Sequence, residues 1–291
     1  MVHRVGLRGC KKENCEMSTI EISHVSQLIE FIETNQSKYI RNQHFLYRGE
    51  SRIDYTLLPS VYRMDNGRDV YLSKTTELHI LNDYMTEAAS YINLPPDDFF
   101  RWLQYAQHFG APTRLLDWTS NPLVALYFAC TSNKNEDGRI YVLNSVGFHY
   151  LTDEKNKMDG KLILEEAMKM IKSSEKTFEY PALFKPYYFD KRMSAQSSQF
   201  MVWGYRKEPL NCMINELEIS GRKQEFVKEE IAPGVQIETS EEISVLFEIH
   251  IKGNKKTILR ELDWLGVNQA SLFPGLDGIG RAIEWRNNSK N

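Results

Sequence analysis

The sequence has no long hydrophobic run, and this absence argues against a membrane-spanning protein. No stretch of its 291 residues approaches the roughly 18 apolar residues that a transmembrane helix needs. Residues 1–18 are polar, with Lys11, Lys12 and Glu13 where a signal peptide would carry its apolar core. We therefore expect no membrane partner, a cytoplasmic location and a flexible leader over residues 1–18.

The sequence also has little excess of charge of either sign. Lys and Arg number 36 and Asp and Glu number 39, which gives a formal net charge of −3. The global positive potential typical of nucleic-acid-binding domains is therefore missing. Hydrophobic residues make up 42% of the chain, which is ordinary for a globular protein and argues against disorder as its main state.

Cysteine is scarce, which argues against a structural zinc site. Among the four cysteines, Cys10 and Cys15 are the only close pair, and no second pair follows them. Cys130 ends an apolar run and Cys212 stands alone. We expect reduced thiols and no metal.

The two commonest nucleotide-binding motifs are missing as well. Neither a GxGxxG nor a GxxxxGK[ST] segment occurs, which argues against a Rossmann site and a P-loop. Helical and strand patterns are mixed without regular βαβ alternation, so the fold class expected is α+β. Helices are predicted over 23–34, 73–91, 97–109, 162–172, 256–265 and from Asn121-Pro122 onward, and strands over 44–49, 138–144, 199–203 and 243–251.

The segment Leu46-Tyr47-Arg48-Gly49-Glu50 contains a short strand pattern that stops at Gly49. A buried guanidinium is costly without a partner, so Arg48 must meet a ligand anion or a protein carboxylate such as Asp117. Gly49 would allow a ligand to approach the backbone.

The segment 104–129 combines many polar side chains with apolar ones. Arg114 and Asp117 are close enough in sequence to form an ion pair. A simple structural alternative exists for Thr119, Ser120 and Asn121, which is to cap the helix that Pro122 begins. His108 has the alternative of an ordinary core or surface histidine.

Two further segments are rich in polar or turn-forming residues. In residues 192–203, amide and hydroxyl side chains precede an apolar strand, where they could bind a ribose hydroxyl or simply form a polar loop. Residues 265–278 contain two turns around an apolar anchor, and we assign them a structural role.

These segments together resemble the FRG-domain family. The resemblance rests on Tyr47-Arg48-Gly49, on the run from Gln107 to Pro122, on Gln196-x-x-Gln199-Phe200, and on the run from Ser271 to Gly278. It spans about residues 20–285 and implies a single FRG domain over residues 19–291.

A weaker resemblance is to the NAD-dependent ADP-ribosyltransferases. It implies an α+β fold with a mixed, mainly antiparallel sheet core and flanking helices, and an Arg beneath the cofactor. Those enzymes use a Glu near a later strand, whereas residues 196–199 here contain none, so Glu50 becomes the reserve carboxylate. By this resemblance the catalytic residues would be Arg48, Gln196, Glu50, Thr119 and Ser120, and the cofactor-binding residues Tyr47, Gly49, His108, Arg114, Asp117, Trp118, Tyr127 and Gln199.

Three functions follow from these observations. The first is an ADP-ribosyltransferase-like enzyme that uses NAD as substrate, cleaves the nicotinamide–ribose bond as a transferase or glycohydrolase, and serves as a toxin, effector or phage-defence protein with a protein or nucleic-acid acceptor. Tyr127 or Trp118 would stack on the nicotinamide. The second, motivated by the missing Glu, is a non-catalytic ligand-sensing FRG module. The third is a nucleic-acid-acting protein, suggested by the 12% aromatic content and by His108 near Arg114 and Asp117.

Overall fold

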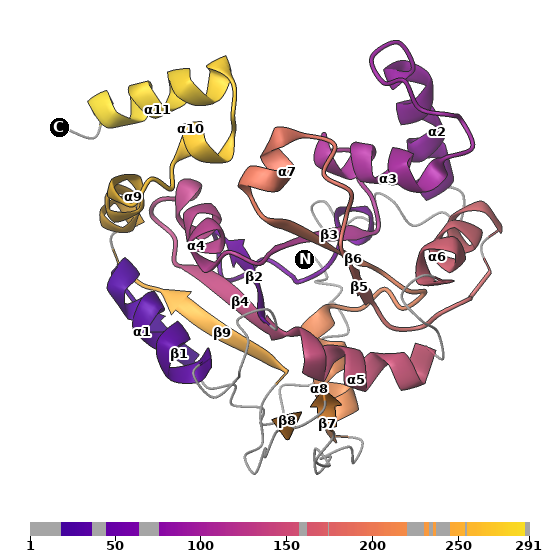
Figure 1. The fold of residues 1–291 in the computed structure, drawn as a ribbon, viewed down its shortest axis with the longest axis horizontal. Helices are drawn as coiled ribbons and strands as arrows, with labels where there is room; N and C mark the ends of the chain where they lie inside the picture. Colours follow the sequence, from indigo (N-terminus) through magenta and orange to yellow (C-terminus); the bar gives the residue numbers. More distant parts are fainter. Residues whose placement is uncertain are drawn as a thin grey trace, which may run out of the picture.

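The structure is a computed structural model that describes residues 19–36, 45–63, 76–156, 162–173, 175–219, 230–232, 235–236, 245–253 and 255–288 (Figure 1). The leader predicted over residues 1–18, with Cys10 and Cys15, lies outside the described residues. Among the helices described, none is both long and apolar enough to cross a membrane.

A seven-stranded mixed sheet forms the centre of the fold, in the order β1-β9-β4-β2-β3-β6-β5. Only the β1–β9 pair is parallel, and the other neighbouring pairs are antiparallel. The predicted α+β class with a mixed sheet and flanking helices is thereby confirmed. The strands are β1 (Thr19–Ile22), β2 (Phe45–Glu50), β3 (Leu115–Thr119), β4 (Gly138–Asn144), β5 (Ala182–Phe184), β6 (Ser198–Val202) and β9 (Leu246–Ile251).

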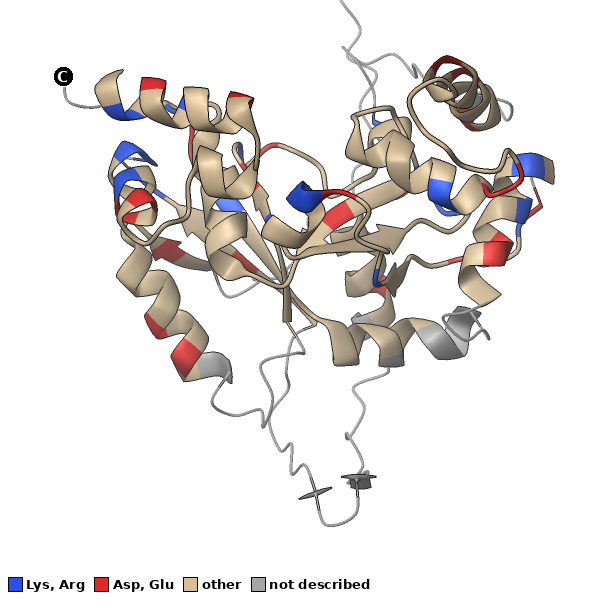
Figure 2. Ribbon diagram, turned by 45° about the horizontal axis from the view of Figure 1, so that its top comes forward, with Lys and Arg blue, Asp and Glu red and all other residues tan. Residues whose placement is uncertain are grey.

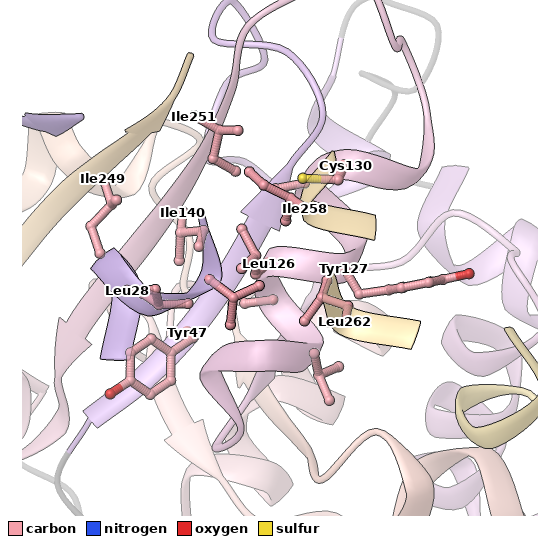
Figure 3. Packing of buried hydrophobic residues seen from close by; sticks show 14 of the residues in the cluster. Leu28, Tyr47, Leu126, Tyr127, Cys130, Ile140, Ile249, Ile251, Ile258 and Leu262 are labelled. Carbon is pink, nitrogen blue, oxygen red and sulfur yellow. The ribbon is translucent and has the colours of Figure 1, made fainter. Parts of the chain in front are cut away.

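Two groups of helices cover one face of the sheet. The first group, α1 (Val25–Gln36), α4 (Pro122–Thr131) and α9 (Lys255–Trp264), covers one half of this face. Helix α4 is apolar on every side, as expected for a helix buried between the sheet and α9. Figure 3 shows its side chains packed against those of β2, β4 and β9.

The other half of the same face is covered by a second group of helices. These are α2 (Thr76–Ala88), α3 (Phe99–His108), α6 (Leu162–Ser173) and the short α7 (Lys191–Ala195). Their apolar side chains pack on Leu115 of β3 and on Phe200 and Val202 of β6.

The opposite sheet face packs against α5 (Ser145–Asn156) and α8 (Leu210–Ile219), with the loop that holds Leu57 and Leu58. The remaining elements are η1 (Ser60–Tyr62), the pair β7 (Glu230–Ala232) and β8 (Val235–Gln236), and the C-terminal helices α10 (Gln269–Leu272) and α11 (Leu276–Asn288).

Strands β2 and β3 separate almost as soon as they meet. Their ladder consists of a single pair, Tyr47 opposite Thr119, whereas β2 pairs with β4 over six residues from Phe45 to Glu50. Tyr47 and Thr119 face the same side of the sheet because directly opposed residues do so. The gap between β2 and β3 therefore opens at the boundary between the two groups of helices, near the middle of the molecule in Figure 1.

Most predicted elements are present, with shifted ends. Strand β4 has the predicted bounds, Gly138–Asn144. The strand predicted over 243–251 is described from Leu246 onward, and residues 243–244 lie outside the described part. Strand β3 was not among the predicted strands, because its run is short and is interrupted by Asp117.

Candidate functional site

A cavity of about 370 Å³ opens where β2 and β3 separate. Strands β2, β3 and β6 contribute to it, as do α3, α4 and α7, together with Phe273 after α10. Arg48 and Gln196, which are far apart in the sequence, thus line one cavity. The sequence-predicted site residues that line it are Tyr47, Arg48, Gly49, Glu50, His108, Asp117, Trp118, Thr119 and Gln196.

The guanidinium of Arg48 lies in the gap between the two strands. Its Nε donates to Oε1 of Glu50 at 2.7 Å, and its Nη1 donates to the backbone oxygen of Asp117 at 2.7 Å. The salt bridge predicted between Arg48 and the Asp117 carboxylate is therefore corrected, since Glu50 is the partner. The Arg48 side chain thus links β2 to β3 where their backbones no longer pair, and it keeps the gap between these strands open.

Gly49 allows helix α4 to approach the sheet. A Cβ at this position would lie 1.9 Å from the backbone oxygen of Ala125 and 2.8 Å from the amide nitrogen of Ala129, closer than any real contact. The side chain of Asn121 caps α4 by accepting from the amide of Leu123 at 3.0 Å. The capping alternative is thus confirmed for Asn121 and is wrong for Thr119 and Ser120.

Asp117 is held by a chain of hydrogen bonds that starts in the backbone of its own strand. The amide of Leu115 donates to the Thr113 hydroxyl at 3.0 Å, and that hydroxyl donates to Oε1 of Gln107 at 2.5 Å. This fixes the orientation of the Gln107 amide, whose Nε2 donates to Oδ2 of Asp117 at 2.7 Å. Gln107, Thr113 and Asp117 all lie in the run from Gln107 to Pro122, so this run contains the whole series of hydrogen bonds.

The Asp117 carboxylate is exposed to the cavity although protein surrounds its recessed position. Solvent reaches the carboxylate, but the surrounding protein removes part of its hydration. This burial raises the pKa of Asp117 above the ordinary value. The nearby charge of Arg48 and the hydrogen bond from Gln107 act in the opposite direction without cancelling the effect. Oδ1 receives no hydrogen bond from another residue's side chain in the described part of the chain.

His108 contributes the edge of an aromatic ring rather than a charge. Its ring makes edge-on contacts with Phe109 and Phe189, and burial lowers its pKa. Nε2 lies 3.5 Å from Oδ1 of Asp190 and makes no hydrogen bond within the described residues. The imidazole is therefore neutral near pH 7.

Thr119 joins the end of β3 to the end of α7. Its hydroxyl donates to the backbone oxygen of Gln196 at 2.7 Å and accepts from the amide of Asn121 at 3.0 Å. Ser197 then turns the chain into β6 with φ of +49°. Nε2 of Gln196 donates to the backbone oxygen of Leu272 at 3.1 Å. Gln196 is thus fixed from two sides beside the cavity.

Nine residues of the cavity lining were given no role from the sequence, and four of them bear on ligand binding. Arg192 lies in the first turn of α7, with its Cζ 5.6 Å from the ring centre of Phe273, and no carboxylate of the described chain lies within ion-pair distance of it. Phe128 meets the same Phe273 ring edge-on, with centres 6.1 Å apart. Gln107 is the fourth. Gln107 and Phe273 belong to runs that carry the family resemblance, whereas only proximity in the fold marks Arg192, because no spacing rule links α7 to the other elements of the cavity.

Four predicted site residues lie outside this cavity. Arg114 is buried and paired with Glu77, with Nη2 2.6 Å from Oε2, so the ion pair predicted with Asp117 is wrong. Gln199 is opposite Trp118 in the β3–β6 ladder and faces the other side of the sheet from Asp117. The remaining two are Tyr127, which lines a separate cavity and donates to Gln269 at 2.6 Å, and Ser120, which is exposed outside the lining.

Two predicted aromatic residues line the cavity without offering a ring face. The Trp118 side chain is 3% exposed and packs in the apolar cluster on the opposite sheet face. Tyr47 is 2% exposed and packs beneath α4 (Figure 3). Stacking of a ligand on Trp118 or Tyr127, as predicted from the sequence, therefore does not fit this geometry, whereas Phe128 and Phe273 are only half-buried at the cavity.

Within the described residues, no group of three or more His, Cys, Asp or Glu side chains is placed to bind a metal ion. Of the described cysteines, Cys130 is a buried thiol outside any disulfide.

Comparison with known proteins gives one match, to a family model that covers part of the chain. Residues 43–138 match the family model of the FRG domain. This stretch holds β2, the Gln107–Asp117 chain, β3 and α4, and it confirms the resemblance predicted from the Tyr-Arg-Gly motif. No curated protein matches the chain, and no solved structure does.

Proposed function

We propose that the cavity between β2 and β3 binds NAD and that the protein cleaves the bond between nicotinamide and ribose. One observation carries this proposal: the Tyr-Arg-Gly strand, the Asp117 strand and the Gln196 turn, which are far apart in the chain, line one cavity. Its volume lies within the range of about 300–1,000 Å³ typical of small-molecule sites.

The side chains at the cavity suit the positively charged nicotinamide end of NAD. The half-buried rings of Phe128 and Phe273 offer aromatic surface, which attracts a cationic ring. Gln107 and Gln196 bring amides that can bond a carboxamide or a ribose hydroxyl. The carboxylate of Asp117 adds a negative charge at the cavity.

Arg192 suits the opposite charge, that of the pyrophosphate. Figure 2 shows basic residues at the start of α7, near the middle of the molecule. Arg48 is less suited to this role because Glu50 and the Asp117 backbone already occupy two of its nitrogens. We therefore assign phosphate binding to Arg192, and to Arg48 the support of the gap.

Calorimetric titration of NAD into Arg192→Gln tests this assignment. A charge-assisted hydrogen bond contributes about 1.5–3 kcal/mol, so the Kd should rise by roughly tenfold or more. Lys191→Gln is the matched control, because it removes the same charge from the same helix outside the cavity lining, and its Kd should change by less than about twofold. Equal effects of the two substitutions, or no NAD binding by the unmodified protein, would contradict the proposal.

A non-catalytic sensing module is the second candidate function. The observation that favours it is the pair Gln196 and Gln199 in the segment where the transferases place a Glu. Incubation of the pure protein with NAD, followed by assay of free nicotinamide, separates the two functions. Binding without release, with and without cell extract as a source of acceptors, favours the sensing module.

A further inference from the structure

We propose that Asp117 is the catalytic carboxylate of this site and takes the place of the Glu missing from residues 196–199. This inference rests on the proposed function. It follows from the arrangement of the carboxylates in and around the cavity, and it assigns Asp117 a catalytic role where the sequence indicated only cofactor binding.

Other carboxylates near the cavity are occupied. Glu50 is 7% exposed and is bonded to Arg48. Asp190 caps α7 by accepting from the amide of Arg192 at 2.7 Å, and it does not line the cavity. Asp117 is the one carboxylate of the described chain that both lines the cavity and is exposed to it.

The mounting of Asp117 is that of a preorganised group. Its strand is anchored on one side by β6, where Asp117 is opposite Phe200, and on the other by the Arg48 contact with its backbone oxygen. Gln107 donates to Oδ2 of Asp117 and itself accepts from Thr113. Because these bonds fix Oδ2, the position of Oδ1 is fixed as well. Such a group stabilises a developing positive charge without first having to reorganise.

The step proposed is hydrolysis of NAD. The bond between ribose C1′ and the nicotinamide nitrogen breaks, and its electron pair leaves with nicotinamide, which becomes neutral. The positive charge passes to the ribose, where the Asp117 carboxylate stabilises it. A water oxygen then bonds to C1′, and its proton passes to Asp117 and on to solvent. The products are ADP-ribose, nicotinamide and one proton. A carboxylate that burial has made more basic is suited to accept that proton.

The surroundings of Asp117 determine its pH dependence. Deprotonation is required for the step, so kcat/KM should fall as the pH decreases through a pKa above the ordinary value of 3.8 for this group. The charged or titratable groups that face Asp117 are Arg48 and Glu50 on β2, Arg63 after η1, His108 on α3 and Arg192 on α7.

The experiment compares NAD binding and nicotinamide release in Asp117→Asn, Asp54→Asn and the unmodified protein. Asparagine keeps the size of the side chain and an oxygen for Gln107. Release by Asp117→Asn should fall by roughly 100-fold or more, as when one preorganised electrostatic group is removed, while its Kd for NAD changes by less than about threefold. Asp54→Asn, at an exposed site outside the cavity, should release nicotinamide at the unmodified rate.

Chemical rescue provides a second readout. Asp117→Ala leaves space for a small carboxylate, so added formate should restore part of the release, while chloride at equal ionic strength should not. The low-pH decrease of kcat/KM should be missing from the residual activity of Asp117→Asn.

Each outcome decides between the two proposals. Release by Asp117→Asn within about threefold of the unmodified rate overturns the role of Asp117 and leaves NAD cleavage standing. Loss of NAD binding in Asp117→Asn makes Asp117 a binding group and overturns its catalytic role. Failure of the unmodified protein to bind NAD contradicts the proposed function itself, and binding without release favours the sensing module and overturns this inference.

Discussion

Two carboxylates lie at one cavity, and their surroundings give them different properties. Glu50 is buried and paired with Arg48, while Asp117 is open to the cavity and has a raised pKa. A buried carboxylate in an ion pair commonly has a structural role, whereas a carboxylate that lines a cavity and has a perturbed pKa is a candidate for a reactive role. Retaining a costly charge at Asp117 is a loss of stability that function would explain.

The charge of Asp117 should lower stability as the pH rises. Its pKa is raised in the folded state, so the carboxyl ionises more readily in the unfolded chain, and stability falls as pH rises above 3.8 through the folded pKa. Asp117→Asn lacks this loss. Urea unfolding between pH 3 and pH 7 should therefore show the variant gaining stability relative to the unmodified protein as pH increases.

Asp54 provides a control of opposite sign. The hydrogen bond from Arg52 lowers the pKa of this exposed group, so its charge stabilises the fold at neutral pH and that contribution is lost as pH falls through the folded pKa. Asp54→Asn should be slightly less stable than the unmodified protein at pH 7. An Asp117→Asn curve that ran parallel to that of Asp54→Asn would show that the folded-state pKa of Asp117 is lowered rather than raised, and would contradict this account.

Arg48 and Glu50 should behave as one unit in stability. Arg48→Met leaves the Glu50 charge buried without its partner, which costs about 3 kcal/mol or more. Adding Glu50→Gln removes that charge, so the double variant should recover part of the loss, with a coupling energy of at least about 1 kcal/mol in denaturant unfolding. The exposed pair Arg52 and Asp54 should show a much smaller coupling. Strictly additive losses of stability at Arg48 and Glu50 would contradict the proposal that this ion pair acts as one unit.

At the scale of elements, the position of α4 depends on the missing side chain of Gly49. The helix backbone occupies the space that a Cβ would need, and backbone cannot move as a flexible side chain can. This close approach brings Phe128 to the cavity and leaves the neighbouring Tyr127 on a separate one. The Gly of the Tyr-Arg-Gly motif is thus explained by packing, while a role of its backbone in ligand binding stays a prediction.

Gly49→Ala should therefore be among the most destabilising single changes in the chain. Overpacking commonly costs about 1–3 kcal/mol and here should reach the top of that range or exceed it. Gly280→Ala in α11 is the control, because a Cβ there meets nothing within 4 Å and alanine favours a helix by roughly 0.5–1 kcal/mol. Thermal unfolding should show a large decrease in Tm for the first and no decrease for the second. Similar small effects would show that α4 can shift away from β2.

At the scale of the whole molecule, the sequence predicted the fold class because the strongest patterns lie in the largest elements. The run Gly138–Asn144 has an uninterrupted strand pattern, and it is the strand that pairs with both β2 and β9. By contrast β3 was not predicted, because Asp117 breaks its apolar pattern. That interruption is the feature that places a carboxylate at the cavity.

The site was predicted in part, for a physical reason. Motifs local in sequence, such as Tyr47-Arg48-Gly49, could be recognised from spacing and residue type. Arg192 could not be recognised in this way, and Phe273 was recognised only as part of a motif with a structural role. The position of both at the cavity depends on how α7 and the turn after α10 pack over the sheet. Tyr127 was assigned wrongly because its neighbour Phe128 points to the cavity, and adjacent helical residues face different directions.

The most direct test of the NAD site is a crystal structure of the protein soaked with NAD, or with a non-hydrolysable analogue. The account predicts the nicotinamide ribose between β2 and β3, with its C1′ within about 3.5 Å of a carboxylate oxygen of Asp117, and the pyrophosphate beside Arg192. Density for the dinucleotide in the cavity lined by Tyr127 and Trp285, or at neither cavity, would contradict it.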